Sequence, residues 1–282
     1  MAGARPRTLS VAVVPVLVGT AVASAEGRVI WWRSLLALVV SLAIQIGTNY
    51  SNDYSDGLRG TDTVRVGPVR LVAGGLASPE AVRTAAFASF LVAACSGLVL
   101  ALATSPVLIA VGAACILAGW FYTGGPRPYG YAALGEVFVF VFFGLVAVAG
   151  TTYVNLGHLS GLSLLAAVPV GLCAVALLVV NNLRDLENDA AAGKRTLAVR
   201  LQDRGTRIFY EACLIVSFAA VGGAAVLRIG ALLGLGALSV AVAPFVLVRR
   251  GSTGRDLVRV LEMTGRLELV LGVLLAAGIA WL

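Results

Sequence analysis

The chain has 282 residues, of which 59% are hydrophobic and 12% are charged, and its mean hydropathy is +0.95. This composition excludes an ordinary soluble protein, whose surface is mostly polar and charged, and indicates a polytopic membrane protein. The net charge of +7 does not indicate nucleic-acid binding, because that function needs a basic face on a soluble domain.

Nine apolar stretches are long enough to cross a bilayer, which takes about 20 apolar residues. Proline and glycine within them do not argue against helices, because membrane helices contain both more often than soluble helices do. We therefore predict an all-α fold in which residues 1–282 form one membrane domain of about nine transmembrane helices. The stretches are 8–25, 33–50, 80–103, 106–122, 132–153, 161–182, 207–227, 230–248 and 264–282.

The first stretch, 8–25, also resembles a signal peptide, because a basic start precedes an apolar run that ends in Ala-Ser-Ala at 23–25. The number of further stretches favours an ordinary first helix. Four cysteines lie within apolar stretches and show no CxxC spacing, so they do not indicate a disulfide or a zinc site. We predict that they pack in the core; they are Cys95, Cys115, Cys173 and Cys213.

Basic residues alternate between the two ends of the predicted helices. If the amino terminus is cytoplasmic, 18 of the 21 Lys and Arg residues fall in the tail and in every second loop, and only Arg28, Arg33 and Arg228 fall elsewhere. One missed or added helix would invert every later loop, so the pattern supports nine helices. By the positive-inside rule it predicts a cell-membrane protein with a cytoplasmic amino terminus and cytoplasmic polar loops.

The second stretch, 33–50, runs into a cluster of amides and carboxylates, TNYSNDYSDGLRGTD, at residues 48–62. Acidic side chains at a membrane edge are costly unless a partner, most simply a cation, compensates them. Spacings of three and four predict that the polar residues share one face of a helix that continues past the apolar run. These residues are Gln45, Asn49, Asn52, Asp53 and Asp56.

A second cluster, NNLRDLENDAAAGKRT, follows the sixth stretch, and Asn181, Asp185 and Asp189 recur there at the spacing of one helical face. Asp53 and Asp185 are 132 residues apart, a displacement of four helices that suggests two related four-helix halves and a ninth helix. Helix ends that are four helices apart emerge on the same side of a membrane. The two clusters could therefore face each other across one cavity.

Local pairing with Arg59 or Arg184 would explain a single acidic cluster. Two clusters in equivalent places, each followed by basic sequence that contains glycine, favour a shared ligand. Carboxylates and amides suit Mg²⁺, which combines a few protein oxygens with those of a substrate phosphate, and Arg and Lys suit the phosphates themselves. The pattern favours a polyanion that Mg²⁺ bridges between two aspartate helices.

Other kinds of chemistry have little support. The single histidine, His158, is predicted in a short loop on the opposite face from both clusters, and the chain contains no P-loop motif. The remaining hypothesis is a lipid-soluble substrate with a diphosphate. Metal ions would neutralise the departing diphosphate, and apolar helix walls would house a hydrocarbon chain and a reactive allylic cation.

These motifs, with the loop YTGGPRPYGYAALGE and the start ARPRTLSVAVVPVLVGTAVA, resemble the UbiA superfamily of intramembrane aromatic prenyltransferases. The resemblance covers essentially the whole chain, and YTGGPRP is similar to the naphthoate-prenylating branch. It implies a nine-helix bundle around a central cavity, with Mg²⁺ as cofactor. It also implies that a polyprenyl group passes from polyprenyl diphosphate to 1,4-dihydroxy-2-naphthoate, with loss of CO₂ and a proton, to give a demethylmenaquinone.

The resemblance assigns residues to roles. Catalytic roles fall on Asp53, Asp56, Asp185, Asp189 and Lys194. The implied metal ligands are Asn52, Asp53, Asp56, Asp62, Asn181, Asp185 and Asp189. Substrate contacts fall on Asn49, Asn52, Asn181, Arg65, Arg70, Arg195, Tyr122 and Arg127. The ordinary alternatives are that Tyr122 is an interface aromatic and that the basic residues only set the topology.

Three further positions carry expectations. Many superfamily members have an acid where this chain has Gly60, which leaves Asp62 as the substitute ligand. Gln202 occupies a position where the resemblance leads us to expect glycine. Glu136 would orient the acceptor or take a proton, although a carboxylate at a helix end is the commoner explanation.

Three rival functions stay open at this point. A related enzyme would use 4-hydroxybenzoate, homogentisate or a sugar phosphate as acceptor. A cation-coupled transporter would use the aspartates as an ion site, but such sites tend to lie near the bilayer midplane. A phosphatidyltransferase expects one compact acidic motif, and two motifs 132 residues apart fit it poorly.

Overall fold

The structure, a computed structural model, describes residues 3, 5, 8–60 and 70–281. These residues form helices and the connections between them, and contain no strand, as the composition predicted. The elements are α1 (Ser10–Glu26), α2 (Trp31–Leu58), α3 (Pro79–Ala103), α4 (Val107–Phe121), η3 (Tyr129–Ala132), α5 (Gly135–Val139), η4 (Phe140–Val146), α6 (Ala147–Leu156), α7 (Gly161–Arg184), α8 (Leu186–Ala191), α9 (Leu197–Leu227), η5 (Ile229–Ala237), α10 (Leu238–Arg249) and α11 (Gly254–Trp281).

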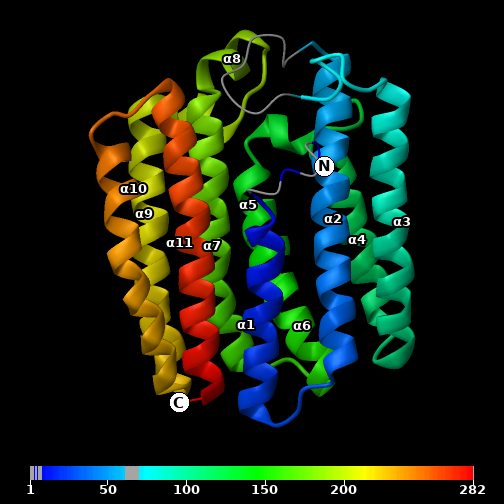
Figure 1. The fold of residues 1–282 in the computed structure, drawn as a ribbon, viewed down its shortest axis with the longest axis vertical. Helices are drawn as coiled ribbons and strands as arrows, with labels where there is room; N and C mark the ends of the chain where they lie inside the picture. Colours follow the sequence, from blue (N-terminus) through cyan, green and yellow to red (C-terminus); the bar gives the residue numbers. More distant parts are fainter. Residues whose placement is uncertain (1–2, 4, 6–7, 61–69, 282) are drawn as a thin grey trace.

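The long helices run up and down one bundle (Figure 1). Seven helical segments in the described part of the chain are long and apolar enough to cross a membrane, counting α5 to α6 and η5 to α10 as one segment each. The shorter apolar helices α1 and α4 bring the described helical rods to about nine, which confirms the predicted class of fold. We call the end that carries Leu58, Arg184 and α8 the polar end, and the opposite end the far end.

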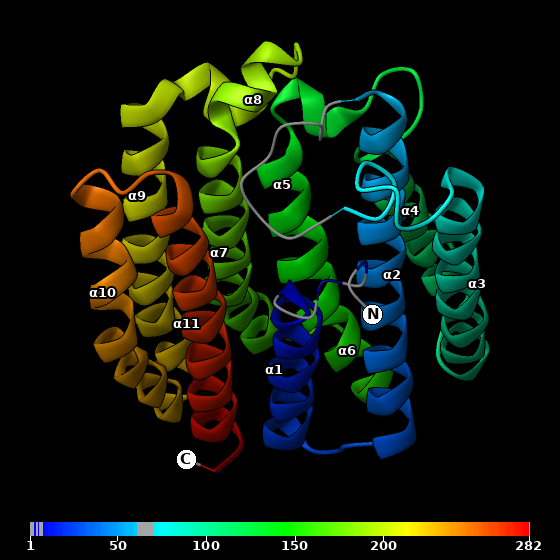
Figure 2. The same cartoon turned by 45° about the horizontal axis from the view of Figure 1, so that its top comes forward.

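The bundle has two sides with a layer between them. On one side α2 packs against α3 and α4, and on the other α7 packs against α9, while α1 and α6 lie between the two (Figures 1 and 2). The two helices that carry the acidic clusters, α2 and α7, therefore both end at the polar end, on opposite sides of the middle layer. This arrangement agrees with the expected four-helix displacement.

Three helices extend further into the polar end than hydropathy indicated. The stretches predicted at 33–50, 207–227 and 264–282 belong to α2, α9 and α11, which span Trp31–Leu58, Leu197–Leu227 and Gly254–Trp281. Hydropathy marks only the apolar part of a helix, whereas backbone hydrogen bonding continues into turns that are polar on one face. Helix α2 thus continues past its apolar stretch, as the polar spacing predicted, and α9 and α11 begin before theirs.

Close helix contacts depend on glycine. A side chain on Gly272 of α11 would overlap Val14 of α1, and one on Gly144 of η4 would overlap Gly171 of α7. Such small residues let membrane helices approach closely enough to gain packing energy. Large apolar side chains such as Leu91 and Ile215 are exposed on the outside of the bundle, where a bilayer would cover them.

The far end is closed by hydrogen bonds between helix ends. The guanidinium of Arg33 donates to the carbonyls of Ala103 and Val154, each at 2.8 Å, and so ties α2 to the ends of α3 and α6. The amide of Asn155 donates to the hydroxyl of Ser34 at 3.0 Å. The Arg33 guanidinium thus satisfies carbonyls that a helix end otherwise leaves without a partner.

Helix α9 is kinked at Gln202, where φ is 58° and ψ is 179°. This combination belongs to a region that only glycine occupies readily. The kink separates a short first turn, held by Thr196 as the N-terminal cap, from the long apolar part of the helix. The expectation of a glycine at this position thus has a physical basis in the backbone.

We predict that Gln202→Gly raises the melting temperature of the protein. The strained backbone costs about 1–3 kcal/mol, of which glycine returns roughly 0.5–1 kcal/mol through its greater freedom when unfolded. A net gain of about 1 kcal/mol corresponds to a rise of about 2–4 °C. Thermal unfolding of the purified protein in one detergent measures it, with Gln202→Ala as a control that keeps the strain. A Gln202→Gly protein that melts at or below the wild-type temperature contradicts the prediction.

Candidate active site

One cavity of about 320 Å³ begins at the polar end and continues down the bundle between α2, α4 and the rod formed by α5, η4 and α6. The wall at the polar end consists of carboxylate, amide and basic side chains. Deeper in the bundle the wall is mostly apolar and includes Ala37, Val40, Leu100, Val111 and Val146. The cavity therefore has a charged mouth and a hydrocarbon-like interior.

A polar stripe on α2 lines the upper cavity. Gln45, Asn49, Asn52 and Asp56 follow spacings of four, three and four, which place them above one another on one helical face, and all four are buried. The helix does continue past the apolar run, as predicted. Thr123 donates its hydroxyl hydrogen to the Asn52 side-chain oxygen at 2.7 Å, which fixes the orientation of that amide.

Asp53 does not share this stripe, although the sequence analysis placed it there. It follows Asn52 directly, so it is turned by about 100° around the helix, and it is not among the residues that line the cavity. Its two carboxylate oxygens accept hydrogen bonds from the backbone amides of Leu71 and Val72 at 3.0 and 3.1 Å. The carboxylate thus holds the loop that follows α2.

The second cluster departs from the predicted continuous helical face. Helix α7 ends at Arg184, Asp185 lies at the break, and α8 begins at Leu186 with a new direction. The face predicted for Asn181, Asp185 and Asp189 thus spans two helices, although the backbone amides of Asp185 and Asp189 still donate to the carbonyls of Asn181 and Asp185 at 3.2 and 2.8 Å. All three nevertheless line the same cavity as the α2 stripe.

Arg184 binds its own neighbours. Its guanidinium donates to both carboxylate oxygens of Asp185, at 2.8 and 2.7 Å, and to the side-chain oxygen of Asn181 at 2.9 Å. Local pairing, the ordinary alternative for one cluster, thus occurs at the second cluster. Arg59 behaves differently, because its guanidinium donates to the backbone carbonyls of Thr123 and Gly125.

Lys194 joins the two clusters. Its ammonium lies 3.2 Å from a carboxylate oxygen of Asp56 and 3.5 Å from one of Asp189, so it bridges α2 and α8. Burial alone would lower the pKa of Lys194, but the two carboxylates outweigh that effect and raise it. Lys194 is therefore charged at neutral pH, and the clusters do face each other across the cavity.

Tyr131 completes this contact. Its hydroxyl donates to the same Asp56 oxygen, and its ring lies 4.8 Å from the Lys194 ammonium. Burial and the Asp56 carboxylate raise the pKa of Tyr131, so the phenol keeps its proton and remains a donor. The sequence analysis missed Tyr131; its signal was an aromatic residue in the polar loop PRPYGY.

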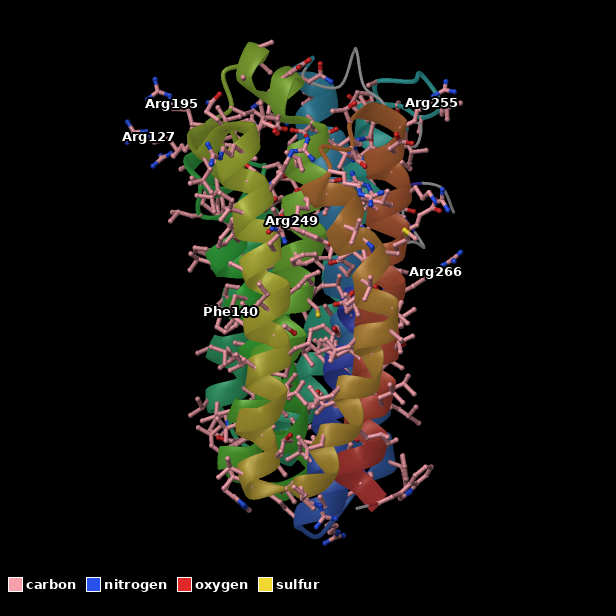
Figure 3. All side chains as sticks on the ribbon, turned by 90° about the vertical axis from the view of Figure 1, so that its left-hand side faces the viewer. Arg127, Phe140, Arg195, Arg249, Arg255 and Arg266 are labelled. Atoms are coloured by element: carbon pink, nitrogen blue, oxygen red, sulfur yellow. The ribbon has the colours of Figure 1, made fainter. Side chains whose placement is uncertain are left out.

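The remaining predicted residues divide into three groups. Asn49, Arg70 and Tyr122 line the cavity. Arg127 and Arg195 are exposed and point away from the bundle at the polar end (Figure 3), so the geometry does not support their predicted contacts with substrate. Asp62 and Arg65 lie outside the described residues.

A series of aromatic rings lines the cavity wall, and the sequence analysis assigned only Tyr122 among them. Tyr122 and Tyr129 meet edge to face with centroids 5.5 Å apart, and Tyr129 stacks on Phe138 at 3.9 Å. Phe138 continues to Phe142 at 5.8 Å. Phe142 belongs to η4, a π-helical segment, and such segments are frequent at functional sites.

The positions of Arg5 and Glu136 qualify earlier expectations, and the position of His158 agrees with the prediction. Arg5 lines the cavity, although the sequence analysis treated it only as a topology signal. Glu136 is buried and accepts a hydrogen bond from Asn182 at 3.0 Å. Of these two residues, Asn182 lines the cavity and Glu136 does not. Glu136 therefore reaches the cavity through Asn182. His158 is exposed between α6 and α7 at the far end, away from both clusters, as predicted.

The expectation for the cysteines is confirmed for Cys173 and Cys213, which are buried in the core. Cys95 is exposed on α3 and Cys115 lines the cavity, so core packing was wrong for these two. All four are free thiols in the structure.

The donor set fits Mg²⁺ only in part. Within the described residues, no three His, Cys, Asp or Glu side chains lie close enough to hold a metal ion by themselves. Mg²⁺ does not need such a cage, because it is usually held by one or two carboxylates together with water and phosphate oxygens. Asp56 and Asp189 already have one cation, Lys194, between them, so the mouth of the cavity is electrostatically suited to positive charge.

Known proteins are similar to this chain in sequence and in fold. A protein-family model described as "UbiA prenyltransferase family" matches residues 12–264. The chain belongs to this family. A 1,4-dihydroxy-2-naphthoate octaprenyltransferase of Mycobacterium tuberculosis is 48% identical over 281 residues, which cover 100% of this chain and 96% of the relative. The enzyme of that name from Escherichia coli is 37% identical over 219 residues, covering 75% of this chain and 71% of the relative.

Solved structures of distant UbiA homologues have the same fold. The apo structure of a UbiA homologue from Aeropyrum pernix superposes with a TM-score of 0.70 at 14% identity, over 96% of both chains. A UbiA homologue from Archaeoglobus fulgidus bound to GPP and Mg²⁺ superposes with a TM-score of 0.65 at 12% identity, over 96% of this chain and 99% of the other.

We predict that Lys194→Gln destabilises the protein when no divalent metal is present. The substitution leaves the carboxylates of Asp56 and Asp189 without their shared cation, and breaking a buried pair costs about 3 kcal/mol. Thermal unfolding in EDTA measures the loss, and Lys194→Arg, which keeps the charge, is the matched control.

Added Mg²⁺ should raise the melting temperature of Lys194→Gln more than that of the wild type, because a bound cation replaces the lost ammonium. Equal melting temperatures for Lys194→Gln and the wild type in EDTA would show that the bridge contributes nothing to the fold.

Proposed function

We propose that this UbiA-family membrane prenyltransferase uses Mg²⁺ to transfer a polyprenyl group from polyprenyl diphosphate to 1,4-dihydroxy-2-naphthoate, with loss of CO₂ and diphosphate. The observation that carries the proposal is the meeting of the two acidic clusters at Lys194, at the mouth of an apolar cavity. The product is a prenylated naphthoquinol, which oxidation converts to a demethylmenaquinone.

The acceptor is proposed from the relatives. The naphthoate octaprenyltransferase of Mycobacterium tuberculosis matches this chain from end to end at 48% identity. This match supports naphthoate over hydroxybenzoate or homogentisate as the acceptor. The predominance of basic residues in the tail and in the loops of the polar end supports a cytoplasmic mouth, through which both charged substrate groups would enter.

The charged mouth suits a diphosphate. Asn52, Asp56, Asn181, Asp185 and Asp189 are the residues that would hold Mg²⁺, and bound Mg²⁺ would neutralise charge on the departing diphosphate. Lys194 and Arg70 supply charge-assisted hydrogen bonds to phosphate oxygens from the protein side. Lys194 lies within reach of both clusters, so a phosphate group that enters between them meets its ammonium directly.

The cavity wall suits a carbocation. When the donor ionises, the allylic C–O bond breaks and both electrons leave with the diphosphate, so positive charge develops on the allylic carbon. The rings of Tyr129, Phe138 and Phe142 offer aromatic faces that stabilise a cation and contain no nucleophile that competes strongly with the acceptor. The naphthoate ring then attacks this carbon, its carboxylate leaves as CO₂, and the electron pair of the broken C–C bond restores the aromatic ring of the quinol.

A cation-coupled transporter is the second candidate from another class. Its ion site is expected near the middle of the membrane at a broken helix. The acids that line the cavity gather at the polar end, and the deeper wall of the cavity is mostly apolar. This distribution favours a substrate with a charged head and a long apolar tail.

We predict Mg²⁺-dependent formation of a prenylated naphthoquinol or its quinone by the purified full chain in detergent. The assay contains radiolabelled polyprenyl diphosphate, 1,4-dihydroxy-2-naphthoate and either Mg²⁺ or EDTA, and the product is extracted as lipid. Asp56→Asn and Asp185→Asn should each lower kcat at least 100-fold while the protein still inserts and folds. Product only with 4-hydroxybenzoate or homogentisate would replace the proposed acceptor, and fully active Asp185→Asn would contradict the two-cluster site.

We predict that Phe138→Leu lowers kcat about tenfold with little change in the KM for the donor. The aromatic face contributes about 1–2 kcal/mol to a desolvated cation, which exists only as the reaction proceeds. Phe87→Leu is the control, because Phe87 stacks on Trp120 and does not line the cavity. A kcat for Phe138→Leu within twofold of the control would remove the aromatic wall from the mechanism.

A further inference from the structure

Asp53 has a different environment from the other acids of the two clusters. Asp56, Asp185 and Asp189 line the cavity, whereas Asp53 does not, and Asp53 is only 1% exposed. Both of its carboxylate oxygens accept hydrogen bonds from consecutive backbone amides, those of Leu71 and Val72. Consecutive amides that converge on one anion form a specific and strong contact.

The loop held in this way is compact. The carbonyl of Arg70 accepts from the amide of Gly74 at 3.0 Å, and that of Leu71 accepts from the amides of Leu76 and Ala77 at 2.8 and 3.1 Å. Val72 packs so closely on Gly57 of α2 that a side chain at Gly57 would overlap it. Residues 70–77 therefore rest on the end of α2 as one unit, and Asp53 anchors its first turn.

This unit carries a basic residue into the cavity. Arg70 immediately precedes the two amides that Asp53 binds, it is 9% exposed, and it lines the cavity wall. The anchored nitrogen of Leu71 is bonded directly to the carbonyl carbon of Arg70. The anchor therefore fixes the backbone from which the Arg70 guanidinium extends. Loss of the anchor frees that backbone without removing any residue from the cavity.

A metal ligand at Asp53 would require a different arrangement. The carboxylate would have to leave the amides of Leu71 and Val72 and turn toward the face of Asn52 and Asp56. Two partly buried amides would then lose their hydrogen-bond partners, which disfavours that rearrangement. The geometry favours the loop as the permanent partner of Asp53.

We infer that Asp53 is a positioning residue, which holds the amides of Leu71 and Val72 and thereby places Arg70 in the cavity to bind the donor's diphosphate. The diphosphate part of this inference rests on the proposed function. The adjacent acids Asp53 and Asp56 then have separate tasks: Asp56 faces the ligand, and Asp53 faces the loop that supplies a cation to the ligand.

The first test measures the loop without substrate or metal. Amide hydrogen exchange of peptides that cover residues 70–77 should become at least tenfold faster in Asp53→Ala than in the wild type. Asp56→Ala, the matched control one turn away, should leave that exchange within twofold of the wild type. Asp53→Asn keeps one carbonyl oxygen as an acceptor, so its exchange rate for residues 70–77 should lie between those of Asp53→Ala and Asp56→Ala. If Asp53→Ala does not fold, Asp53→Asn takes its place in the comparison with the wild type.

The second test separates positioning from metal binding. Asp53→Asn should raise the KM for polyprenyl diphosphate about tenfold while the Mg²⁺ concentration for half-maximal activity stays within twofold of the wild type. Arg70→Ala should raise the same KM, and the double variant Asp53→Asn/Arg70→Ala should be no worse than Arg70→Ala alone.

Two results would overturn the inference. One is unchanged exchange of residues 70–77 in Asp53→Ala together with a tenfold higher Mg²⁺ requirement, which assigns Asp53 to the metal. The other is a double variant in which the two single-variant increases in KM multiply. That result would show that Asp53 and Arg70 act independently. An inactive wild type would instead reject the proposed function, while the exchange experiment would still decide whether Asp53 anchors the loop.

Discussion

The ion pairs from Lys194 to Asp56 and Asp189 join two parts of the chain that lie far apart in sequence, the end of α2 and the segment at α8. Asp56 lies near the end of α2, and Asp189 and Lys194 lie in and after α8, so one ammonium joins the two sides of the bundle at the polar end. Without a cation between them the buried carboxylate of Asp56 and the partly buried carboxylate of Asp189 would repel each other. The mouth of the cavity therefore depends on positive charge, from Lys194 in the free protein and from a metal in the proposed complex.

The cavity below the charged mouth suits the apolar part of a substrate whose head is charged. Below it the wall is mostly apolar, and at the far end Arg33 and Asn155 tie the helix ends together. A substrate with a charged head and a hydrocarbon tail has matching surroundings along its whole length. Aromatic rings occupy the wall between the charged mouth and the apolar depth, where a carbon bonded to diphosphate would lie.

Much of this architecture follows from the sequence. Long apolar runs must form helices in a membrane because no water satisfies their backbone, so the class of fold and the approximate helix count were predictable. The spacing of Gln45, Asn49, Asn52 and Asp56 also predicted their common face. The resemblance to a family supplied the roles of the aspartates and the acceptor.

Other features depend on contacts that spacing does not encode. Helix α7 breaks at Asp185, where Arg184 folds back on its neighbours, and no periodicity shows that break. Asp53 binds a loop that is distant in sequence, and Arg127 and Arg195 turn outward, because tertiary contacts decide which side of a loop faces the cavity. Tyr131 was missed because a single aromatic residue in a loop has no distinctive pattern.

The most direct test of the account is whether Asp56 and Asp189 act on one ligand. Calorimetry would measure binding of a non-reactive polyprenyl diphosphonate to Asp56→Asn, Asp189→Asn and the double variant, with Mg²⁺ and with EDTA. If both carboxylates serve one Mg²⁺–diphosphate site, each single variant loses most of the Mg²⁺-dependent affinity and the double variant loses little more. Independent losses that multiply in the double variant, or affinity that does not depend on Mg²⁺, would contradict a shared site.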